Sequence, residues 1–320
     1  MERASVTSDK SSRFHRWAWG AQVLWQHGLP EVVISFLGGA GDDLLCTAPI
    51  HEWLRRGARR IWFISRHPSL HRFDRRVRVL HEDAAFLALA SKIGRPTRFV
   101  SYSKYNDTLD RDTPLTRPLI AEMCALAGLQ GDITLRPRLS LNEKEIEGAA
   151  AFKDTLLVQS SGLTAAVPML NKQWHAERIQ GVVEQLSSDI RVVQIGSIQD
   201  PPLKGVLDLR GKTAFRETAA MLHQARLFFG MAGFPMHLAR AVDCPAVIIY
   251  GGREPAELTG YPCNINLSYA PDCAPCWQRN RCDHDRVCLG KITVDESVSA
   301  IRQALSIRRE NPLAVAQYRL

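Results

Sequence analysis

The chain has 320 residues, 45% of them apolar, so it can bury a full core, and its length fits two domains better than one. Its 41 Lys and Arg against 33 Asp and Glu give a formal charge of +8, which favours anionic partners without choosing among them. No apolar run reaches the roughly 18 residues of a membrane span, and residues 1–17 lack the apolar core of a signal peptide, so we expect a cytoplasmic protein.

Residues 1–30 read as a peripheral N-terminal segment. A polar head is followed by apolar residues at helical spacing, namely Phe14, Trp17, Ala21, Leu24 and Trp25. This helix either packs on the body of the protein or lies at the inner face of the cytoplasmic membrane, where Arg13, His15 and Arg16 would meet anionic lipid.

Strand and helix patterns alternate from residue 31 onward. The runs EVVISFLGG and ARRIWFISR are typical of buried parallel strands, and a second series of such units extends from DTLLVQSSG to PAVIIYGG. A polar stretch between the two series places a boundary near residue 150, and Thr293 is the expected N-cap of a C-terminal helix. The sequence therefore predicts an α/β protein with parallel-sheet domains at 31–150 and 151–320 and an active site between them.

A glycine turn carries two adjacent carboxylates. In LGGAGDDLLCTAP, Gly38, Gly39 and Gly41 follow a strand, and Asp42 and Asp43 open the next helix. Glycines permit close backbone approach, and the free amides of a helix N-terminus attract an anion. An aspartate here is either a general base facing the cleft or a helix cap, and the residues alone leave both interpretations open.

Turns after later strands carry candidate ligands for a nucleotide diphosphate. Ser160, Ser161 and Lys172 lie in or after a loop of small and hydroxyl residues, where a lysine either binds phosphate or is simply solvated. Two further turns contain Gly196 with Ser197, and Gly211 with Lys212 and Thr213. The last of these lacks the first glycine of a Walker motif, so we exclude a P-loop NTPase.

A further loop ends in a helix with a histidine in its first turn. Gly233 precedes this helix, Met236 and His237 lie in its first turn, and all three are candidate donor-binding residues. The imidazole either hydrogen-bonds a phosphate or ribose in the cleft or packs in the core.

Taken together, these stretches resemble glycosyltransferase family 9, the group that contains the ADP-heptose:lipopolysaccharide heptosyltransferases. The resemblance covers roughly residues 31–305. The motifs that carry it, in chain order, are GGAGDDLLCTAP, NKQWHAERI, VVQIGS, LRGKTAFRETAAMLHQARLFFG, MHLARAVDCPAVIIYGG and CLGKITVDESVSAI.

The resemblance implies a GT-B fold, in which two Rossmann-like domains with parallel sheets face each other across a cleft. The acceptor would bind the N-terminal domain and the nucleotide-sugar the C-terminal one. Asp42 matches the family's proposed base, with Asp43 one step out of register, while Lys172 matches a lysine that contacts donor phosphates and His237 the histidine of a Gly-x-x-His turn.

One position departs from the family pattern. Ala232 stands where the family usually has an acidic residue that helps to hold the donor, and Asp200 is a candidate for supplying a carboxylate nearby. This departure keeps two functions under consideration. One is active transfer, and the other is a catalytically weakened relative that binds a nucleotide or glycan as a scaffold.

The function that the resemblance implies is an inverting, metal-independent glycosyltransferase. It would move a sugar, for example heptose, from an ADP-linked nucleotide-sugar to a hydroxyl of a lipopolysaccharide core, another glycan or a protein. Nucleic acid is not an expected partner, because no nucleic-acid-binding module is present. The arginines near 55–60 and 72–78 are either solvated faces or contacts to an anionic membrane or phosphorylated acceptor.

The C-terminal part contains a Cys-rich loop at 263–288. Four cysteines, Cys273, Cys276, Cys282 and Cys288, are spaced to supply four thiolates to a structural zinc or iron ion, with Cys263 and His284 as alternative ligands. Free thiols and disulfides are the other interpretations, and a reducing compartment disfavours disulfides. A metal here would hold the loop together and take no part in catalysis.

Overall fold

The computed structural model describes residues 21–36, 38–81, 89, 96–307 and 313–320. Much of the predicted N-terminal helix, including Phe14 and Trp17, lies outside these ranges, but residues 21–27 are helical. The face that this helix buries differs from the prediction. Val23 is 5% exposed, whereas Trp25 is 86% exposed.

The first sheet is built from β-branched and aromatic runs such as IWFIS, which is buried along its whole length. All neighbouring strands are parallel, and the order is β3-β2-β1-β4. Their bounds are Val32–Ser35 for β1, Ile61–Ser65 for β2, Val77–His81 for β3 and Thr97–Phe99 for β4. Because the chain order reverses beside β1, the loops after β1 and β4 lie next to each other at a topological switch point.

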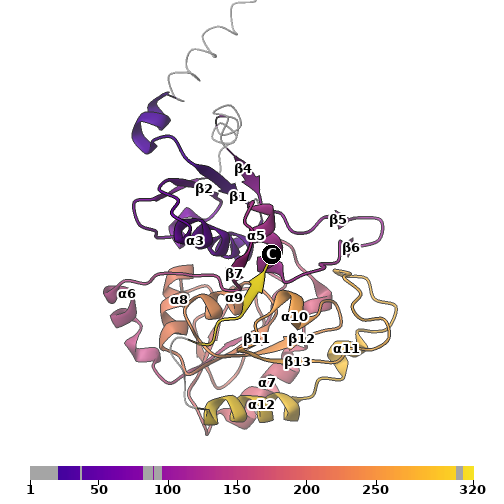
Figure 1. Cartoon of the computed structure of the whole chain (residues 1–320). Helices are drawn as coiled ribbons and strands as arrows, with labels where there is room; N and C mark the ends of the chain where they lie inside the picture. The colour runs from indigo at the N-terminus through magenta and orange to yellow at the C-terminus, as the bar shows by residue number, and fades with distance from the viewer. Residues whose placement is uncertain (1–20, 37, 82–88, 90–95, 308–312) are drawn as a thin grey trace, which may run out of the picture.

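The second sheet has the order β10-β9-β8-β11-β12-β13, again with parallel neighbours. Its strands are β8 (Leu156–Gln159), β9 (Val192–Ile195), β10 (Leu207–Asp208), β11 (Leu227–Met231), β12 (Ala246–Tyr250) and β13 (Ile265–Ser268). We call residues 31–134 the N-terminal unit, 135–155 the linker and 156–306 the C-terminal unit. Figure 1 shows the first unit above the second.

Helices cover the sheets of both units. Those of the N-terminal unit and linker are α2 (Ala40–Leu45), α3 (Thr47–Arg55), α5 (Leu119–Leu126) and α6 (Glu143–Gly148), with the 3-10 turns η1 (Pro68–Leu70) and η2 (Ala150–Phe152). Those of the C-terminal unit are α7 (Ala176–Leu186), α8 (Phe215–Gln224), α9 (Phe234–Ala241), α10 (Ala256–Thr259), α11 (Val287–Gly290) and α12 (Val294–Ser306), with the 3-10 turn η3 (Leu170–Lys172). Thr293 caps α12 as predicted, since its side chain accepts a hydrogen bond from the Glu296 amide.

Two short antiparallel pairs complete the fold. β5 (Tyr105–Asn106) and β6 (Arg111–Asp112) form a hairpin that reaches toward the Cys-rich loop (Figure 1). β7 (Asp132–Thr134) pairs with β14 (Gln317–Arg319), so the last strand of the chain returns to the N-terminal unit. The sequence pattern did not predict this return, and the domain boundary near residue 150 stays a prediction.

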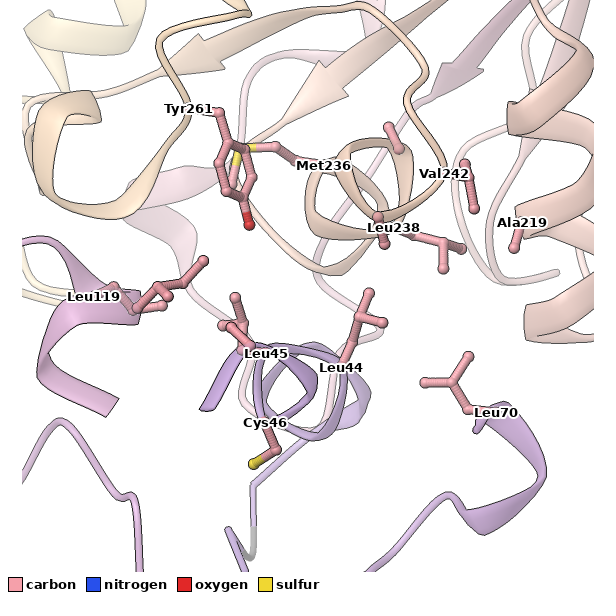
Figure 2. Packing of buried hydrophobic residues seen from close by; sticks show 14 of the residues in the cluster. Leu44, Leu45, Cys46, Leu70, Leu119, Ala219, Met236, Leu238, Val242 and Tyr261 are labelled. Atoms are coloured by element: carbon pink, nitrogen blue, oxygen red, sulfur yellow. The ribbon is translucent and has the colours of Figure 1, made fainter. Parts of the chain in front are cut away.

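The largest hydrophobic cluster is shared by the two units. In Figure 2, Leu44 and Leu45 of α2 point toward α9, which carries Met236 and Leu238. This packing sets the N-terminal end of α2 against the first turn of α9, where the candidate site is found. A separate cluster fills the space between the second sheet and the helices α7 and α12. Within the part of the chain that the structure describes, no helix is both long and apolar enough to cross a membrane.

Candidate active site

Asp42 lies where α2 begins, after the turn that follows β1. Its Oδ2 accepts a hydrogen bond from the Gly39 amide at 2.8 Å, and its Oδ1 accepts one from the Tyr102 hydroxyl at 2.8 Å. Tyr102 can reach it because β4 neighbours β1 at the switch point. Burial raises the pKa of Asp42, although both hydrogen bonds and the charge of Lys172 oppose this. A carboxylate with a raised pKa at such a place is suited to general base catalysis.

Gly38 is required by the close packing around Asp42, whereas a Cβ at Gly41 would make only ordinary contacts. A Cβ on Gly38 would lie 2.1 Å from the Asp42 carboxylate oxygen. A Cβ on Gly41 would meet Phe234 at 3.6 Å and the His237 ring at 3.7 Å. The two units therefore meet directly at Gly41, and Asp42 lies at their junction.

Asp43 has a different environment from its neighbour. It is fully buried, and its Oδ2 accepts hydrogen bonds from the Ser65 hydroxyl at 2.6 Å and the His67 amide at 2.9 Å. Its Oδ1 has no hydrogen-bond partner among the described residues. Because these contacts tie α2 to the end of β2, the geometry favours Asp42 as the base and a structural role for Asp43.

Lys172 comes from η3 of the C-terminal unit. Its Nζ lies 2.6 Å from Oε1 of Glu254, which follows the Gly251–Gly252 turn after β12. Burial lowers the pKa of Lys172, and the Glu254 charge opposes this. Burial alone would raise the pKa of Glu254, but Lys172 and then Arg253 lower it to about 2. Glu254 was not among the residues that the sequence predicted for the site.

His237 completes the group. Its Nδ1 lies 2.7 Å from the Tyr261 hydroxyl, and burial together with the Lys172 charge lowers its pKa to about 3. The imidazole is therefore neutral at pH 7. Met236, also predicted to bind the donor, is 1% exposed and its sulfur accepts a hydrogen bond from Tyr250 at 3.2 Å, so it belongs to the core.

The two predicted serines are engaged by their own loop. Ser160 donates to the Pro201 carbonyl at 2.6 Å, and Ser161 lies 3.2 Å from the Gln173 side-chain oxygen. Both residues are at most 4% exposed. Their contacts shape the loop after β8.

The turns after β9 and β10 are joined to each other. The Gly211 amide donates to the Gly196 carbonyl at 2.8 Å, and both glycines have positive φ. Ser197, Lys212 and Thr213 make local contacts: the Ser197 amide with Asp200, the Lys212 ammonium with the Asp208 carbonyl, and the Thr213 hydroxyl with that of Thr218.

Asp200, the candidate to replace the acid that is absent at Ala232, makes local contacts. That carboxylate accepts from Thr164 at 3.0 Å and from the Ser197 amide at 2.9 Å, so it holds two loops together. Ala232, at the end of β11, is 8% exposed, and Gly233 beside it has extended backbone. The charge of Glu254 acts on the pKa values of Lys172, His237 and Tyr102.

The four predicted cysteine ligands line one cavity of about 240 Å³. Cys273, Cys276, Cys282 and Cys288 surround it together with His284. Cys263 packs instead against the core shared by the units. These cysteines are free thiols, and the described residues include no group of three or more His, Cys, Asp or Glu side chains placed to hold an ion. The thiols thus share a cavity without forming a preassembled ligand set.

Several of the arginines near 55–60 and 72–78 bind within the protein. Arg55 pairs with Glu52 at 2.7 Å, and Arg76 pairs with Asp74 at 2.6 Å. Arg56 and Arg60 donate to backbone carbonyls. These contacts favour the interpretation of this stretch as an ordinary charged surface.

Comparison with known proteins gives a consistent picture. The model of glycosyltransferase family 9 (heptosyltransferase) matches residues 170–285, which contain Lys172, His237 and Glu254. Lipopolysaccharide heptosyltransferase 3 of Escherichia coli is 28% identical over 107 residues, covering 33% of this chain and 31% of the relative. Its counterpart from strain K12 is 28% identical over 102 residues, covering 32% and 30%. The chain thus spans about a third of the curated relatives it matches.

Solved structures extend the likeness to most of the chain. The family 9 glycosyltransferase from Veillonella parvula DSM 2008 aligns with a TM-score of 0.60 at 20% identity, covering 86% of this chain and 97% of that one. E. coli ADP-heptose lps heptosyltransferase II gives 0.61 at 13% identity, with 86% and 98% covered. The iron-containing dodecameric glycosyltransferase TibC from enterotoxigenic E. coli H10407 gives 0.61 at 18% identity, with 86% and 76% covered.

These likenesses establish the fold. The predicted GT-B arrangement of two parallel α/β units is confirmed. The family model and the curated relatives confirm the resemblance that the sequence motifs indicate.

Proposed function

We propose that the protein is an inverting glycosyltransferase that moves a sugar from an ADP-linked nucleotide-sugar to an acceptor hydroxyl. The observation that carries this proposal is the meeting of Asp42, from the N-terminal unit, with Lys172 and His237 from the C-terminal unit. A base on one unit and a cation on the other match a reaction whose acceptor and donor bind opposite sides of a cleft.

The chemistry follows from these groups. Asp42 accepts the proton of the acceptor hydroxyl as its oxygen attacks the anomeric carbon of the donor sugar. The bond from that carbon to the diphosphate breaks on the opposite face, which inverts the configuration. Lys172 and the N-terminal amides of α9 stabilise the charge of the departing diphosphate, so the mechanism assigns no step to a metal ion.

Heptose is the sugar favoured by the relatives, whose names specify heptosyltransferases and, for one, ADP-heptose. The acceptor is a lipopolysaccharide core, another glycan or a protein. A peripheral contact with the anionic inner face of the cytoplasmic membrane belongs to the same proposal, because Trp25 projects from its helix. Binding to anionic vesicles at low salt tests this contact, and absence of binding there rules it out.

A structural zinc or iron ion at the cysteine cavity stays a prediction. The likeness to an iron-containing glycosyltransferase supports it, whereas the present placement of the thiols does not form a ligand set. Elemental analysis of the purified protein tests it. One equivalent of metal in the unaltered protein that is absent from Cys276→Ser would support the site. Metal-free unaltered protein would exclude it.

A scaffold is the second candidate, and Ala232 is the observation that favours it. Thermal unfolding against ADP, UDP, GDP and their sugar conjugates separates the two functions. Saturating ADP should stabilise a functional donor site by about 2.7 kcal/mol at a concentration 100 times its Kd. Transfer of heptose from ADP-heptose would then establish the enzyme. No stabilisation by any nucleotide would favour the scaffold.

A further inference from the structure

The hairpin β5–β6 binds the C-terminal unit through two aspartates. Asp112 accepts hydrogen bonds from Arg279 at 2.6 and 3.0 Å and also binds Arg253, while its amide donates to the Trp277 carbonyl at 3.0 Å. Asp110 accepts from the Asn280 and Arg281 amides, each at 2.6 Å. We call Asp110, Asp112, Arg253 and Arg279 the clasp.

The centre of the clasp is buried, while the Arg279 side chain is 20% exposed. The side chains of Asp112 and Arg253 are 5% and 4% exposed, and Arg279 lies 3.8 Å over the ring of Tyr105. Charges separated from water interact strongly and leave a large penalty when one partner is lost. The relative placement of hairpin and loop is therefore well fixed.

The clasp continues to the lysine of the candidate site. Arg253 binds Glu254, and Glu254 in turn holds the Lys172 ammonium at 2.6 Å. From Arg279 through Asp112, Arg253 and Glu254 to Lys172, positive and negative charges alternate across the two units.

A second connection fixes the backbone of Lys172. Asn171, which precedes it, donates its amide to the Arg279 carbonyl at 2.9 Å and its side-chain nitrogen to the Gln278 and Arg281 carbonyls at 3.1 and 2.8 Å. η3 therefore rests on the same loop that the hairpin holds. The clasp and the loop that it holds therefore position both the backbone and the ammonium group of Lys172.

We propose that Asp112 is a positioning residue that aligns Lys172 for the donor diphosphate through Arg253 and Glu254. The role of Lys172 rests on the proposed function, whereas its alignment by Asp112 is a property of the fold. Without the Asp112 charge, Arg253 and Arg279 lose the carboxylate that they share, and Arg253 competes with Lys172 for Glu254. Lys172 then leaves its present position.

The first test is ADP binding by Asp112→Asn, measured by calorimetry. We expect the Kd to rise about tenfold, comparable to misplacing one charge-assisted contact. Asp243→Asn is the matched control. It weakens the buried pairs of Asp243 with Arg136 at 2.5 Å and with Arg240 at 2.7 Å, which lie outside this chain of charges, and asparagine tolerates the positive φ at that position. Equal weakening in both variants would overturn the proposal, because the effect would then be general loosening.

The second test needs no nucleotide. The acetylation rate of Lys172 by acetic anhydride, followed by mass spectrometry against pH, reports its accessibility and its pKa. Removing the Asp112 charge should lower that pKa and speed labelling several-fold at neutral pH, with no change in Asp243→Asn. Unchanged labelling overturns the proposal. If Asp112→Asn does not fold, Glu254→Gln removes the charge one step nearer to Lys172 in this series of ion pairs. The same measurement of Lys172 labelling then decides the proposal.

The two tests also separate the two proposals. If the unaltered protein binds no nucleotide diphosphate but Lys172 labelling changes as expected, the proposed function fails and the positioning role stands. If ADP binds normally but the labelling of Lys172 is unchanged in both variants, the positioning role fails and the proposed function stands.

Discussion

At the scale of single residues, two adjacent carboxylates with the same chemistry have different roles. Asp42 is held by a tyrosine and by its own turn at the junction of the units, whereas Asp43 is bonded to Ser65 and His67 beneath α2. Neighbouring residues at the start of a helix point about 100° apart, so they meet different elements. The sequence shows only that the two aspartates are adjacent, and the packing gives them different environments.

Replacing each aspartate by asparagine should therefore give opposite phenotypes. In the proposed reaction Asp42 is the general base, so Asp42→Asn should reduce kcat by roughly 10²- to 10⁴-fold while leaving ADP binding intact. Asp43→Asn should lower the free energy of unfolding by about 1–3 kcal/mol through its buried hydrogen bonds. Steady-state transfer assays and urea denaturation check both. A fully active Asp42→Asn would exclude Asp42 as the base.

The hydroxyl of Tyr102 sets the pH range in which Asp42 can act. Its hydrogen bond lowers the Asp42 pKa, which burial raises. A base works only when deprotonated, so activity should rise with pH through this pKa. Tyr102→Phe removes a lowering contact, and the acid limb of kcat/KM should move to higher pH. Phe36, whose ring packs against that of Tyr102, offers Phe36→Leu as a control that keeps the hydroxyl. An acid limb that stays in place in Tyr102→Phe would show that another group controls it.

At the scale of elements, the junction of α2 and α9 determines whether the site exists. α2 has only six residues, and such a short helix is marginal by itself. Leu44 and Leu45 are at most 1% exposed and pack against α9 (Figure 2). Packing therefore fixes α2, and with it the direction of Asp42.

Leu44→Ala should destabilise the protein by about 2–5 kcal/mol, because it leaves a cavity between the units. Leu207→Ala, at a position that is 38% exposed, is the matched surface control and should change stability little. Urea denaturation measures both. Similar stability in both variants would mean that the α2–α9 contact contributes little.

At the scale of the whole molecule, Arg216 joins parts far apart in sequence. It donates to Glu145 of α6 at 2.7 and 2.8 Å, to the Leu70 carbonyl at 2.8 Å and to the Ser140 carbonyl at 2.7 Å. One guanidinium on α8 thus connects the C-terminal unit, the linker and the N-terminal unit. Together with the shared core, it makes the two units depend on each other.

The Arg216–Glu145 pair should make stability depend on acid pH. The bond from Arg216 lowers the Glu145 pKa from 4.5 to about 2. A lowered carboxyl pKa contributes stability above pH 4.5 that is lost as the pH falls toward 2. Arg216→Met should lower the free energy of unfolding by about 2–3 kcal/mol at pH 7 and flatten this loss. Arg302→Met, which breaks an exposed pair with Asp189, is the control. If both variants lost the same stability as the pH falls, the role of the Arg216–Glu145 pair would be contradicted.

The sequence by itself determined the two series of parallel units, the cap at Thr293 and the family resemblance. Buried strands are continuous apolar runs, and a capping box is a local pattern, so both can be read without knowing what packs against them. The glycine turn with Asp42, the lysine at 172 and the histidine at 237 were identified in the same way, because short segments hold them.

Only the tertiary structure showed which contacts surround each of these residues. Asp43, Ser160, Ser161 and Met236 look like site residues in sequence, yet each is held by contacts that bind loops or core. Glu254, Tyr102 and Asp112 carry no local signal, because their partners come from other strands or from the other unit. Sequence patterns report which face of an element is buried, whereas a charge network between distant loops exists only once the chain has folded.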